Sequence, residues 1–323
     1  MPIGHGDMRF VARDGAAVHL RCLRKPTGRS CDCPMTDPPR HSAPDLRCLW
    51  HHLVQRLAGW RSDWDDHIDA DSAAPAWEGP SRGEIVPDGR IFEAFAVALL
   101  SGNTRWERIL RIRPNLGEPF GGFDLRRYAL LTDRDIEERV VPWFRERRAG
   151  ARGLSAGLVR LRDTAARLSS YRAGKGSASA YLADARSASG GSPEQLAILL
   201  ATSKEWKLPG FGIALAAEAL RNMGIDLCKP DRHILRALGS WSLIDFVRWD
   251  RRGAFTPPQA TTAELSRAMF VVRSIAEAND VRVSYATSVI WTAGAVSGAR
   301  LSNGEFEAVA LGCFQSGTRI AER

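Results

Sequence analysis

The chain of 323 residues has no long apolar run, few cysteines and almost no strand-like alternation of apolar and polar residues. No apolar run approaches the roughly 18 residues that a membrane-spanning helix needs. The first residues, MPIGHGDMRFVARDG, lack the apolar segment of a secretory signal. We therefore expect a cytoplasmic protein that is not bound to a membrane.

Cysteine is scarce, with six residues in the whole chain. That number is too small for a disulfide scaffold, and a cytoplasmic protein is expected to keep its thiols reduced. Six potential metal ligands lie near the start of the chain: Cys22, Cys31, Cys33, Cys48, His51 and His52. Their spacing matches no paired CxxC pattern, so we predict no metal site and keep zinc as the alternative.

Positive charge is in excess, with a formal net charge of +8 and a pI of about 9.5. Of the 45 basic residues only 5 are lysines, which leaves 40 arginines. Arginine codons of a GC-rich genome explain the preference for arginine over lysine, but they do not explain the excess over acids. Because neutralising phosphates releases counterions, this balance favours a polyanionic partner.

Composition divides the chain into three parts. Residues 1–45 are rich in Arg, Pro, Gly and Asp without helical or strand periodicity, and we expect them to be weakly ordered. Residues 46–90 hold one accessory helix and a linker. The part from 91 to 323 shows successive helical patterns, so we predict an all-α domain. The expected helices lie at 46–68, 91–100, 104–112, 124–130, 133–148, 153–171, 193–203, 213–223, 232–239, 261–279 and 284–297, with a loop-rich insert at 172–192 around one short helical turn.

Residues 204–224 contain a glycine turn between two helices. The turn, LPGFG at 208–212, follows one expected helix and precedes IALAAEALRNMG, a good helix former. Without side chains, Gly210 and Gly212 let backbone amides approach a phosphate at the start of the second helix, where the helix dipole also favours negative charge. The pattern is typical of a helix-hairpin-helix that contacts a DNA backbone.

An aspartate follows the second glycine by 19 residues. In CKPDRHILRALG, Asp231 comes after a proline and opens another helix, so one interpretation is a plain N-cap. Spacing and residue types together resemble the helix-hairpin-helix DNA glycosylase superfamily, in which L-P-G-hydrophobic-G and a helix precede D-x-H and a helix ending in L-G. The matching residues are Leu208, Pro209, Gly210, Gly212, Asp231, His233, Arg236, Leu238 and Gly239.

This resemblance implies an all-α helix-hairpin-helix glycosylase fold, in which two helical lobes flank a cleft for DNA and a flipped base. The C-terminal helices at 240–323 are expected to pack on the N-terminal lobe. It implies that Asp231 is catalytic, that His233 supports it, and that Leu208 and the two glycines belong to the DNA-binding turn. Strand-cleaving members carry a lysine where this chain has Ala214, so water is the implied nucleophile and no lyase activity is expected.

Cofactors follow from the same resemblance. The four-cysteine loop that holds an iron–sulfur cluster in some members is missing near the C-terminus. We therefore expect no cofactor, although a monovalent cation at the hairpin stays open.

Residues 91–140 resemble 3-methyladenine DNA glycosylase I, a branch of the same superfamily. The shared positions are Phe92, Glu93, Trp106, Leu110, Arg113, Phe120, Phe123 and Asp124. Two features of that branch are missing, because Ala98 replaces a pocket glutamate and the zinc-binding HxxxC near the C-terminus is absent. The resemblance thus assigns Ala98 to a roomier base pocket and the chemistry to Asp231.

Further residues of the front half are candidates for binding the DNA and the flipped base. The resemblance places Asn103, in LSGNT, at the wedge position that fills the gap left by the flipped nucleotide; capping of the next helix is the alternative. In RVVPWFRERRAGAR, arginines beside aromatic residues predict phosphate contacts. We assign Arg145, Arg147 and Arg148 to DNA binding, and Trp106, Trp143 and Phe144 to the base pocket. Core packing and a solvated helix face are the alternatives.

We therefore predict a monofunctional DNA glycosylase that binds double-stranded DNA as a monomer, flips out a modified base and hydrolyses its N-glycosidic bond to leave an abasic site. The resemblance favours an alkylated purine as the base, in a bacterial, nucleoid-associated protein. One alternative is the removal of a hypermodified cytosine, such as glucosylated hydroxymethylcytosine, from phage DNA in antiviral defence. Another is a noncatalytic helix-hairpin-helix DNA-binding protein.

Overall fold

The computed structural model describes residues 44–68, 86–171 and 177–314, without the side chains of His67 and Asn103. Contacts divide the chain into two units, Met1–Arg40 and His41–Arg323, and every described residue belongs to the second unit. The expected weak order of the first residues and the early cysteines before Cys48 lie outside the described part.

The described residues form helices and no sheet, which confirms the predicted all-α class. An isolated antiparallel bridge joins Pro44 to Phe314. The longer helices are α1 (Leu46–Trp60), α3 (Asp88–Asn103), α4 (Trp106–Ile112), α8 (Leu154–Ser170), α9 (Ser177–Ala188), α10 (Pro193–Thr202), α11 (Ile213–Asn222), α12 (Arg232–Ser240), α13 (Thr262–Ala278), α14 (Val283–Ala295) and α15 (Asn303–Leu311). The short ones are η1 (Trp64–His67), η3 (Arg113–Asn115), α5 (Leu125–Ala129), α6 (Asp133–Asp135), the π-helical η4 (Ile136–Val140) and α7 (Val141–Glu146).

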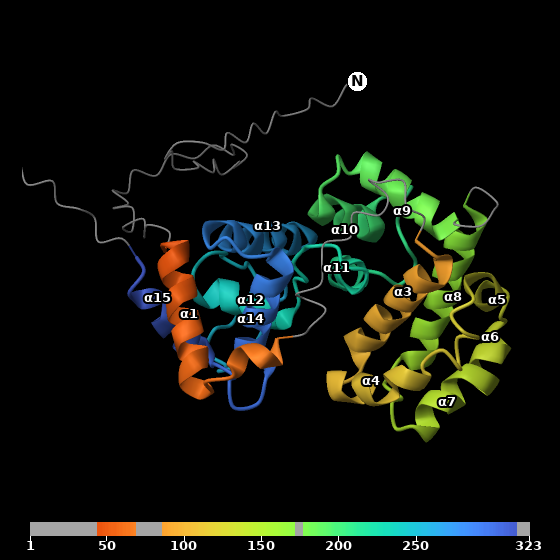
Figure 1. Cartoon of the computed structure of the whole chain (residues 1–323), viewed down its shortest axis with the longest axis horizontal. Helices are drawn as coiled ribbons and strands as arrows, with labels where there is room; N and C mark the ends of the chain where they lie inside the picture. Colours follow the sequence, from red (N-terminus) through yellow and green to blue (C-terminus); the bar gives the residue numbers. More distant parts are fainter. Residues whose placement is uncertain (1–43, 69–85, 172–176, 315–323) are drawn as a thin grey trace, which may run out of the picture. The chain divides into compact units, whose positions relative to one another are not determined.

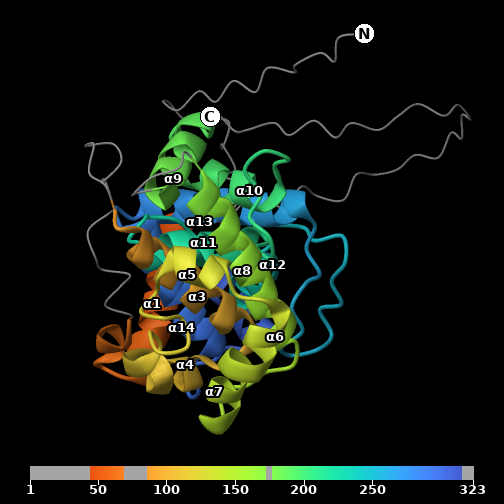
Figure 2. The same ribbon diagram turned by 90° about the vertical axis from the view of Figure 1, so that its right-hand side faces the viewer.

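The helices of the described chain form two groups. Helix α3 is apolar on nearly all sides and lies inside the first group, which also contains α5, α8, α9 and α11. Its residues Ile91 and Phe92 and all those from Ala94 to Leu100 are buried, as expected for a helix with neighbours on every face. Helices α5, α8, α9 and α11 pack against it, and they can be followed around α3 in Figures 1 and 2. Helix α8 covers α3 with a buried stripe at helical spacing that includes Leu154, Leu158 and Leu161.

The second group of helices combines α1 with the helices that follow Asp231 (Figure 1). Helix α1 packs on α13, α14 and α15 through the buried Leu49, Leu53 and Leu57. Asp45 caps α1 by accepting the backbone N–H groups of its first turn. Helix α13 also contacts α10 and α11, so it links this group to the helices of the glycine turn. The helix that we expected as an accessory element is thus part of the C-terminal helical group.

Three expected elements differ in the structure. Helix α1 ends at Trp60, eight residues before the expected end. The helix expected at 133–148 runs without a gap from Asp133 to Glu146, but its middle part is the π-helical η4, between α6 and α7, and the π-helical part ends just before Pro142, whose nitrogen has no hydrogen to donate to a helical bond. The insert at 172–192 contains α9, a full helix whose mostly small residues hide the apolar stripe. No helix among the described residues is both long and apolar enough to cross a membrane.

Candidate functional site

The predicted glycine turn joins α10 to α11, as expected for a helix-hairpin-helix. The buried Leu208 donates its backbone N–H to the carbonyl of Leu200 at 2.8 Å, which fixes the turn to the end of α10. Gly210 has a φ of +81°, a left-handed conformation that glycine adopts without steric cost. Local sequence therefore determines this turn.

The two glycines differ in what surrounds them. A Cβ on Gly210 would lie 2.8 Å from Cβ of Arg160, whereas a Cβ on Gly212 would meet no atom within 4 Å. Gly212 is exposed and N-caps α11, whose first turn has no acidic residue and no side-chain cap. Open space at an uncapped helix N-terminus is an arrangement that suits an anion.

Asp231 is the N-cap of α12. Its Oδ1 accepts the backbone N–H groups of His233 at 2.9 Å and Ile234 at 3.2 Å. Both bonds use the same oxygen, and Oδ2 has no hydrogen-bond partner among the described residues. The half-buried carboxylate is therefore held in place while one oxygen stays free, so capping and a chemical role are compatible.

An ion pair attaches the segment before Asp231 to the hairpin helix. Glu218 of α11 lies 3.4 Å from Nζ of Lys229 and 3.6 Å from Nη1 of Arg221. Glu218 is 8% exposed, so these contacts are largely shielded from water. The backbone N–H of Asp231 donates to the carbonyl of Lys229 at 2.9 Å. Two consecutive contacts thus connect Asp231 to α11.

His233 joins α12 to α14. Its Nδ1–H donates to the carbonyl of Gly294 at 2.9 Å, and Nε2 accepts from Nε of Arg232 at 3.1 Å. Burial lowers the pKa of His233, and the charges of Arg232 and Arg236 act in the same direction against the opposing charge of Asp231. These contacts make His233 a neutral packing side chain next to the predicted catalytic residue; its supporting role stays a prediction.

Arg236 of α12 is buried, at 1% exposure. Its guanidinium donates to the carbonyls of Leu301 at 2.6 Å and Gly294 at 2.9 Å. Burial, reinforced by the nearby charge of Arg300, lowers the pKa of Arg236 to about 10. Arg236 therefore holds the helix that Asp231 opens against α14 and the loop after it.

The last turn of α3 lies against the hairpin helix α11. A Cβ on Gly102 would lie 2.8 Å from Cδ2 of Leu215 in α11. Asn103 is the last residue of α3, and its side chain lies outside the described part, so its wedge role stays a prediction. Trp106 opens α4 and is half-buried against the core.

Two of the predicted base-pocket residues lie in the core instead. Ala98 and Phe144 are both 0% exposed. Ala98 is on the buried helix α3, and the ring of Phe144 packs 6.0 Å from that of Phe120 and 4.9 Å from that of Trp143. The base-pocket assignment of Ala98 and Phe144 is therefore corrected to core packing, because neither side chain reaches solvent in this structure.

Of the remaining predicted residues of α7 and its C-terminal turn, Trp143, Arg145 and Arg148 line one or the other of two hollows, and Arg147 lines neither. Trp143 lines one of about 200 Å³. The guanidinium of Arg147 lies 4.1 Å above the Trp143 ring, and Oε2 of Glu118 accepts from Nε1 of Trp143 at 2.7 Å and lies 3.4 Å from Nη2 of Arg147. Arg145 and Arg148 line a second hollow, of about 490 Å³. Only Arg147 has a carboxylate partner among these three arginines within the described residues.

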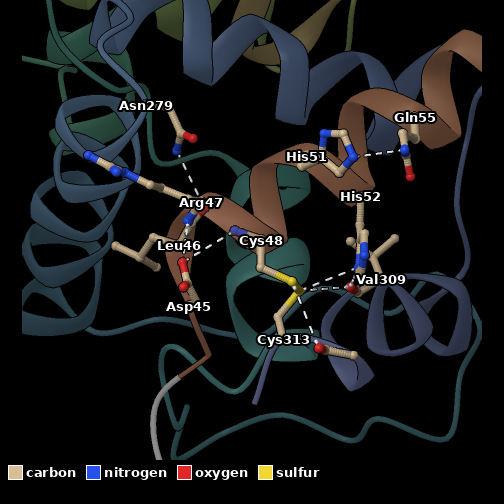
Figure 3. Close-up of a disulfide and its surroundings, with 11 residues drawn as sticks. Asp45, Leu46, Arg47, Cys48, His51, His52, Gln55, Asn279, Val309 and Cys313 are labelled. Carbon is tan, nitrogen blue, oxygen red and sulfur yellow. Dashed lines mark hydrogen bonds between the residues drawn. A yellow bond between two sulfur atoms is a disulfide. The ribbon is translucent and has the colours of Figure 1, made fainter. Parts of the chain in front are cut away.

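Cys48 of α1 and Cys313, just after α15, form a disulfide with a Cα–Cα distance of 5.4 Å, shown in Figure 3. The predicted reduced state is wrong for this pair, which 265 residues separate in the sequence. Nδ1 of His52 lies 3.4 Å from Sγ of Cys313, and the three side chains bring possible metal ligands within 4.8 Å of one another. Zinc binds cysteine as thiolate, so the disulfide and a metal are exclusive uses of these sulfurs.

Sequence reasoning missed Glu218 and Lys229. The available signal was a charged residue among alanines and leucines in IALAAEALRNMG, at a position that faces the interior together with its neighbours. A buried carboxylate requires a partner, and Lys229 is one of only 5 lysines in the chain.

No family model and no curated protein matches the sequence. Among solved structures, the chain is similar to the crystal structure of the 8-oxoguanine DNA glycosylase of Thermotoga maritima, with a TM-score of 0.50 and 17% sequence identity, over 80% of this chain and 100% of that one. This similarity confirms the predicted fold class, an all-α fold of the helix-hairpin-helix glycosylase type. At this identity it concerns the fold alone, and the resemblance to 3-methyladenine DNA glycosylase I stays a prediction.

Proposed function

We propose that this protein is a DNA glycosylase that binds duplex DNA and hydrolyses the N-glycosidic bond of a modified base. The observation that carries the proposal is the placement of Asp231, whose carboxylate is fixed through one oxygen at the start of α12 and free at the other. An ion pair between Lys229 and Glu218 joins the segment before it to the helix of the glycine turn. The similarity in fold to a DNA glycosylase agrees with this assignment.

The glycine turn supplies the proposed grip on the DNA backbone. Gly212 is exposed with open space above its Cα, and the first N–H groups of α11 have no side-chain cap. A phosphate at this position would accept backbone N–H groups and face the positive end of the helix dipole. The excess of arginine over acids adds a long-range attraction for the same partner.

In the proposed reaction the nucleotide leaves the stack and the bond between base and sugar lengthens. Positive charge then develops on the sugar, as in other glycosyl hydrolyses. Oδ2 of Asp231 would stabilise that charge and orient or deprotonate the attacking water, while Oδ1 stays bonded to the backbone of α12. The products are the free base and an abasic site.

Water is the proposed nucleophile. The position after the turn that carries a lysine in strand-cleaving members holds Ala214, and Lys229, two residues before Asp231, is engaged by Glu218. Neither of these two segments offers a free amine beside Asp231, which supports an enzyme without a lyase step. We propose in addition that the reaction needs no cofactor.

We propose an alkylated purine as the base, on the resemblance of residues 91–140 to 3-methyladenine DNA glycosylase I. Oxidised guanine is the second candidate, because the structural neighbour is an 8-oxoguanine DNA glycosylase. Ala98, the residue behind the alternative of a hypermodified cytosine, lies in the core. The hypermodified cytosine is therefore tested together with the other bases, but it is not the preferred substrate.

The test compares wild type with Asp231→Asn on duplexes that carry 3-methyladenine, 7-methylguanine, 8-oxoguanine or glucosylated hydroxymethylcytosine. Released bases are identified by mass spectrometry, and DNA binding is measured in parallel. Asparagine caps helices as well as aspartate, so we expect the variant to fold and bind DNA but to lose base release. Asp124→Asn is the matched control, since Asp124 caps α5 in the same way.

The outcomes separate the alternatives. Base release by wild type and by Asp124→Asn, but not by Asp231→Asn, agrees with the enzyme. DNA binding without release from any duplex in the panel would favour the noncatalytic DNA-binding protein. Trapping of a covalent adduct with borohydride would contradict water as the nucleophile, because only an amine forms a Schiff base.

A further inference from the structure

The turn between α7 and α8 encloses a hollow of about 490 Å³ that is rich in arginine. Its basic side chains come from separate segments: Arg108 from α4, Arg145 from α7 and Arg148 from the turn after α7. The rest of its wall is formed by Val141, Gly150, Ala151, Gly153, Leu154 and Ser155. Three arginines thus line a hollow whose other lining residues are small, apolar or glycine.

Within the part of the chain that the structure describes, no carboxylate pairs with the side chain of Arg108, Arg145 or Arg148. Other arginines of this region do have such partners: Arg134 and Arg147 each lie within 4.0 Å of a carboxylate oxygen. Like charges around one hollow repel each other, and an anion in the hollow would remove that repulsion.

The start of α8 is a second feature of the hollow that favours an anion. Gly153, with a φ of +79°, is the N-cap of this 17-residue helix, and the first turn has neither a side-chain cap nor an acidic residue. A Cβ on Gly153 would meet no atom within 4 Å, so the approach to the helix end is open. The hydroxyl of Ser155 donates to Glu137, a carboxylate that does not line the hollow. The N-terminal end of α8 therefore lines the same hollow as the arginines, through Gly153, Leu154 and Ser155, and its dipole favours an anion there.

We propose that this hollow binds a phosphate group of DNA, at a site separate from the glycine turn. Guanidinium groups bind phosphate oxygens in pairs of parallel hydrogen bonds, and the backbone at a helix N-terminus completes the coordination. The site differs from the sequence-based grouping of Arg145, Arg147 and Arg148, because Arg147 does not line the hollow and Arg108 does. Arg147 is instead paired with Glu118 and lies over the Trp143 ring, and its predicted role in DNA binding stays a prediction.

The proposal rests on the proposed function in one respect, namely that duplex DNA is the partner. Arg108 lies on α4, which begins three residues after Asn103, and the last turn of α3 packs on Leu215 of the hairpin helix. The phosphate comes either from within the DNA strand or from a 5′ end, and the two sources share the chemistry that the hollow recognises.

The experiment measures binding of wild type and Arg145→Ala/Arg148→Ala to a fluorescent duplex over a range of salt concentrations. Arg90→Ala/Arg134→Ala is the control, because it removes the same charge from exposed arginines that already have carboxylate partners. We expect the test variant to bind about tenfold more weakly and to lower the slope of log K against log salt by about one. The control should stay within about twofold of wild type.

Arg108→Gln is a second variant on a different helix, and we expect it to weaken binding in the same direction. Urea unfolding of each variant verifies that it is folded. Each titration uses one duplex with 5′-hydroxyl ends and one with 5′-phosphates. Weaker binding of both duplexes places an internal phosphate in the hollow, whereas loss of only the extra affinity for 5′-phosphates places a terminal one there.

Equal binding by wild type and the folded test variants would overturn the proposal, and so would equal weakening by the test and control variants. If wild type binds and processes a modified duplex while these results are obtained, the proposed function stands and only the hollow is refuted. If wild type binds no duplex, both proposals fail.

Discussion

Oε2 of Glu218 lies 3.4 Å from Nζ of Lys229, and this contact joins the helix of the glycine turn to the segment that carries Asp231. The first of these elements is the proposed grip on the DNA backbone, and the second holds the proposed catalytic carboxylate. Chemistry at a flipped nucleotide requires that the two keep a fixed separation. A shielded ion pair between them is a direct way to keep it.

The first prediction concerns this ion pair. Glu218→Ala leaves the ammonium of Lys229 and the guanidinium of Arg221 without their carboxylate in a largely buried setting. We expect the free energy of unfolding to fall by about 3 kcal/mol. Glu277→Ala, which removes an exposed glutamate of α13, should change it by less than about 0.5 kcal/mol. Urea denaturation measures both, and equal values for the two variants would show that the pair contributes little.

The second prediction separates the two glycines of the turn. Gly210→Ala should destabilise the protein by about 1–2 kcal/mol, because alanine is strained at a φ of +81°, and its Cβ would also meet Arg160. Gly212→Ala should leave stability within about 0.5 kcal/mol of wild type, because its φ is −85° and the space around it is open.

The turn also allows a prediction about DNA binding, which depends on Gly212. A methyl group on Gly212 stands where a phosphate would approach the amides of α11, and the loss of one such hydrogen bond corresponds to about tenfold weaker binding. Fluorescence anisotropy with an undamaged duplex measures this. Unchanged binding by Gly212→Ala would place the phosphate elsewhere.

The glycine turn and its helices were predictable because their causes are local. Two glycines and a preceding Leu-Pro between helical patterns determine the turn, and a polar residue before a helix determines the N-cap at Asp231. The all-α class follows from the same periodicity. These features depend on residues a few positions apart, so one sequence is sufficient to predict them.

The role of individual front-half residues was not predictable, because core and pocket side chains share the same helical spacing. Ala98 and Phe144 match a pocket as well as they match the core, and only the packing of α3 and α7 distinguishes the two. Whether Arg147 is free to contact DNA depends on its ion pair with Glu118, which lies 29 residues away in sequence. The bond between Cys48 and Cys313 depends on how α1 packs at the other end of the chain.

The third prediction concerns pH. Burial lowers the pKa of His233 below its usual 6.5, so near and below that pH the folded state binds fewer protons at this residue than the unfolded state. The stability that depends on neutral His233 is therefore complete above about pH 6.5 and declines as the pH falls toward the folded pKa. In His233→Gln this decline should be absent. Unfolding free energies at pH 8 and pH 5 measure the difference.

His51→Gln is the control for this experiment. His51 is exposed on α1 and bonds only to the side chain of Gln55 among the described residues. We expect its decline in stability between pH 8 and pH 5 to match that of wild type. A wild-type decline that persists unchanged in His233→Gln would show that another group titrates.

The last prediction concerns the disulfide. Cys48 and Cys313 close a loop across almost the whole described chain, and cross-linking restricts the unfolded state most when the loop is long. We expect Cys313→Ala, or a reductant, to lower the free energy of unfolding by about 3 kcal/mol. The reductant should have no further effect on Cys313→Ala, because Cys48 has then lost its partner and the other described cysteine, Cys228, is buried and unpaired. If oxidised and reduced wild type unfold at the same urea concentration, the two sulfurs are not joined in solution. The next measurement is then urea unfolding with added zinc, because Cys48, His52 and Cys313 could bind the metal instead.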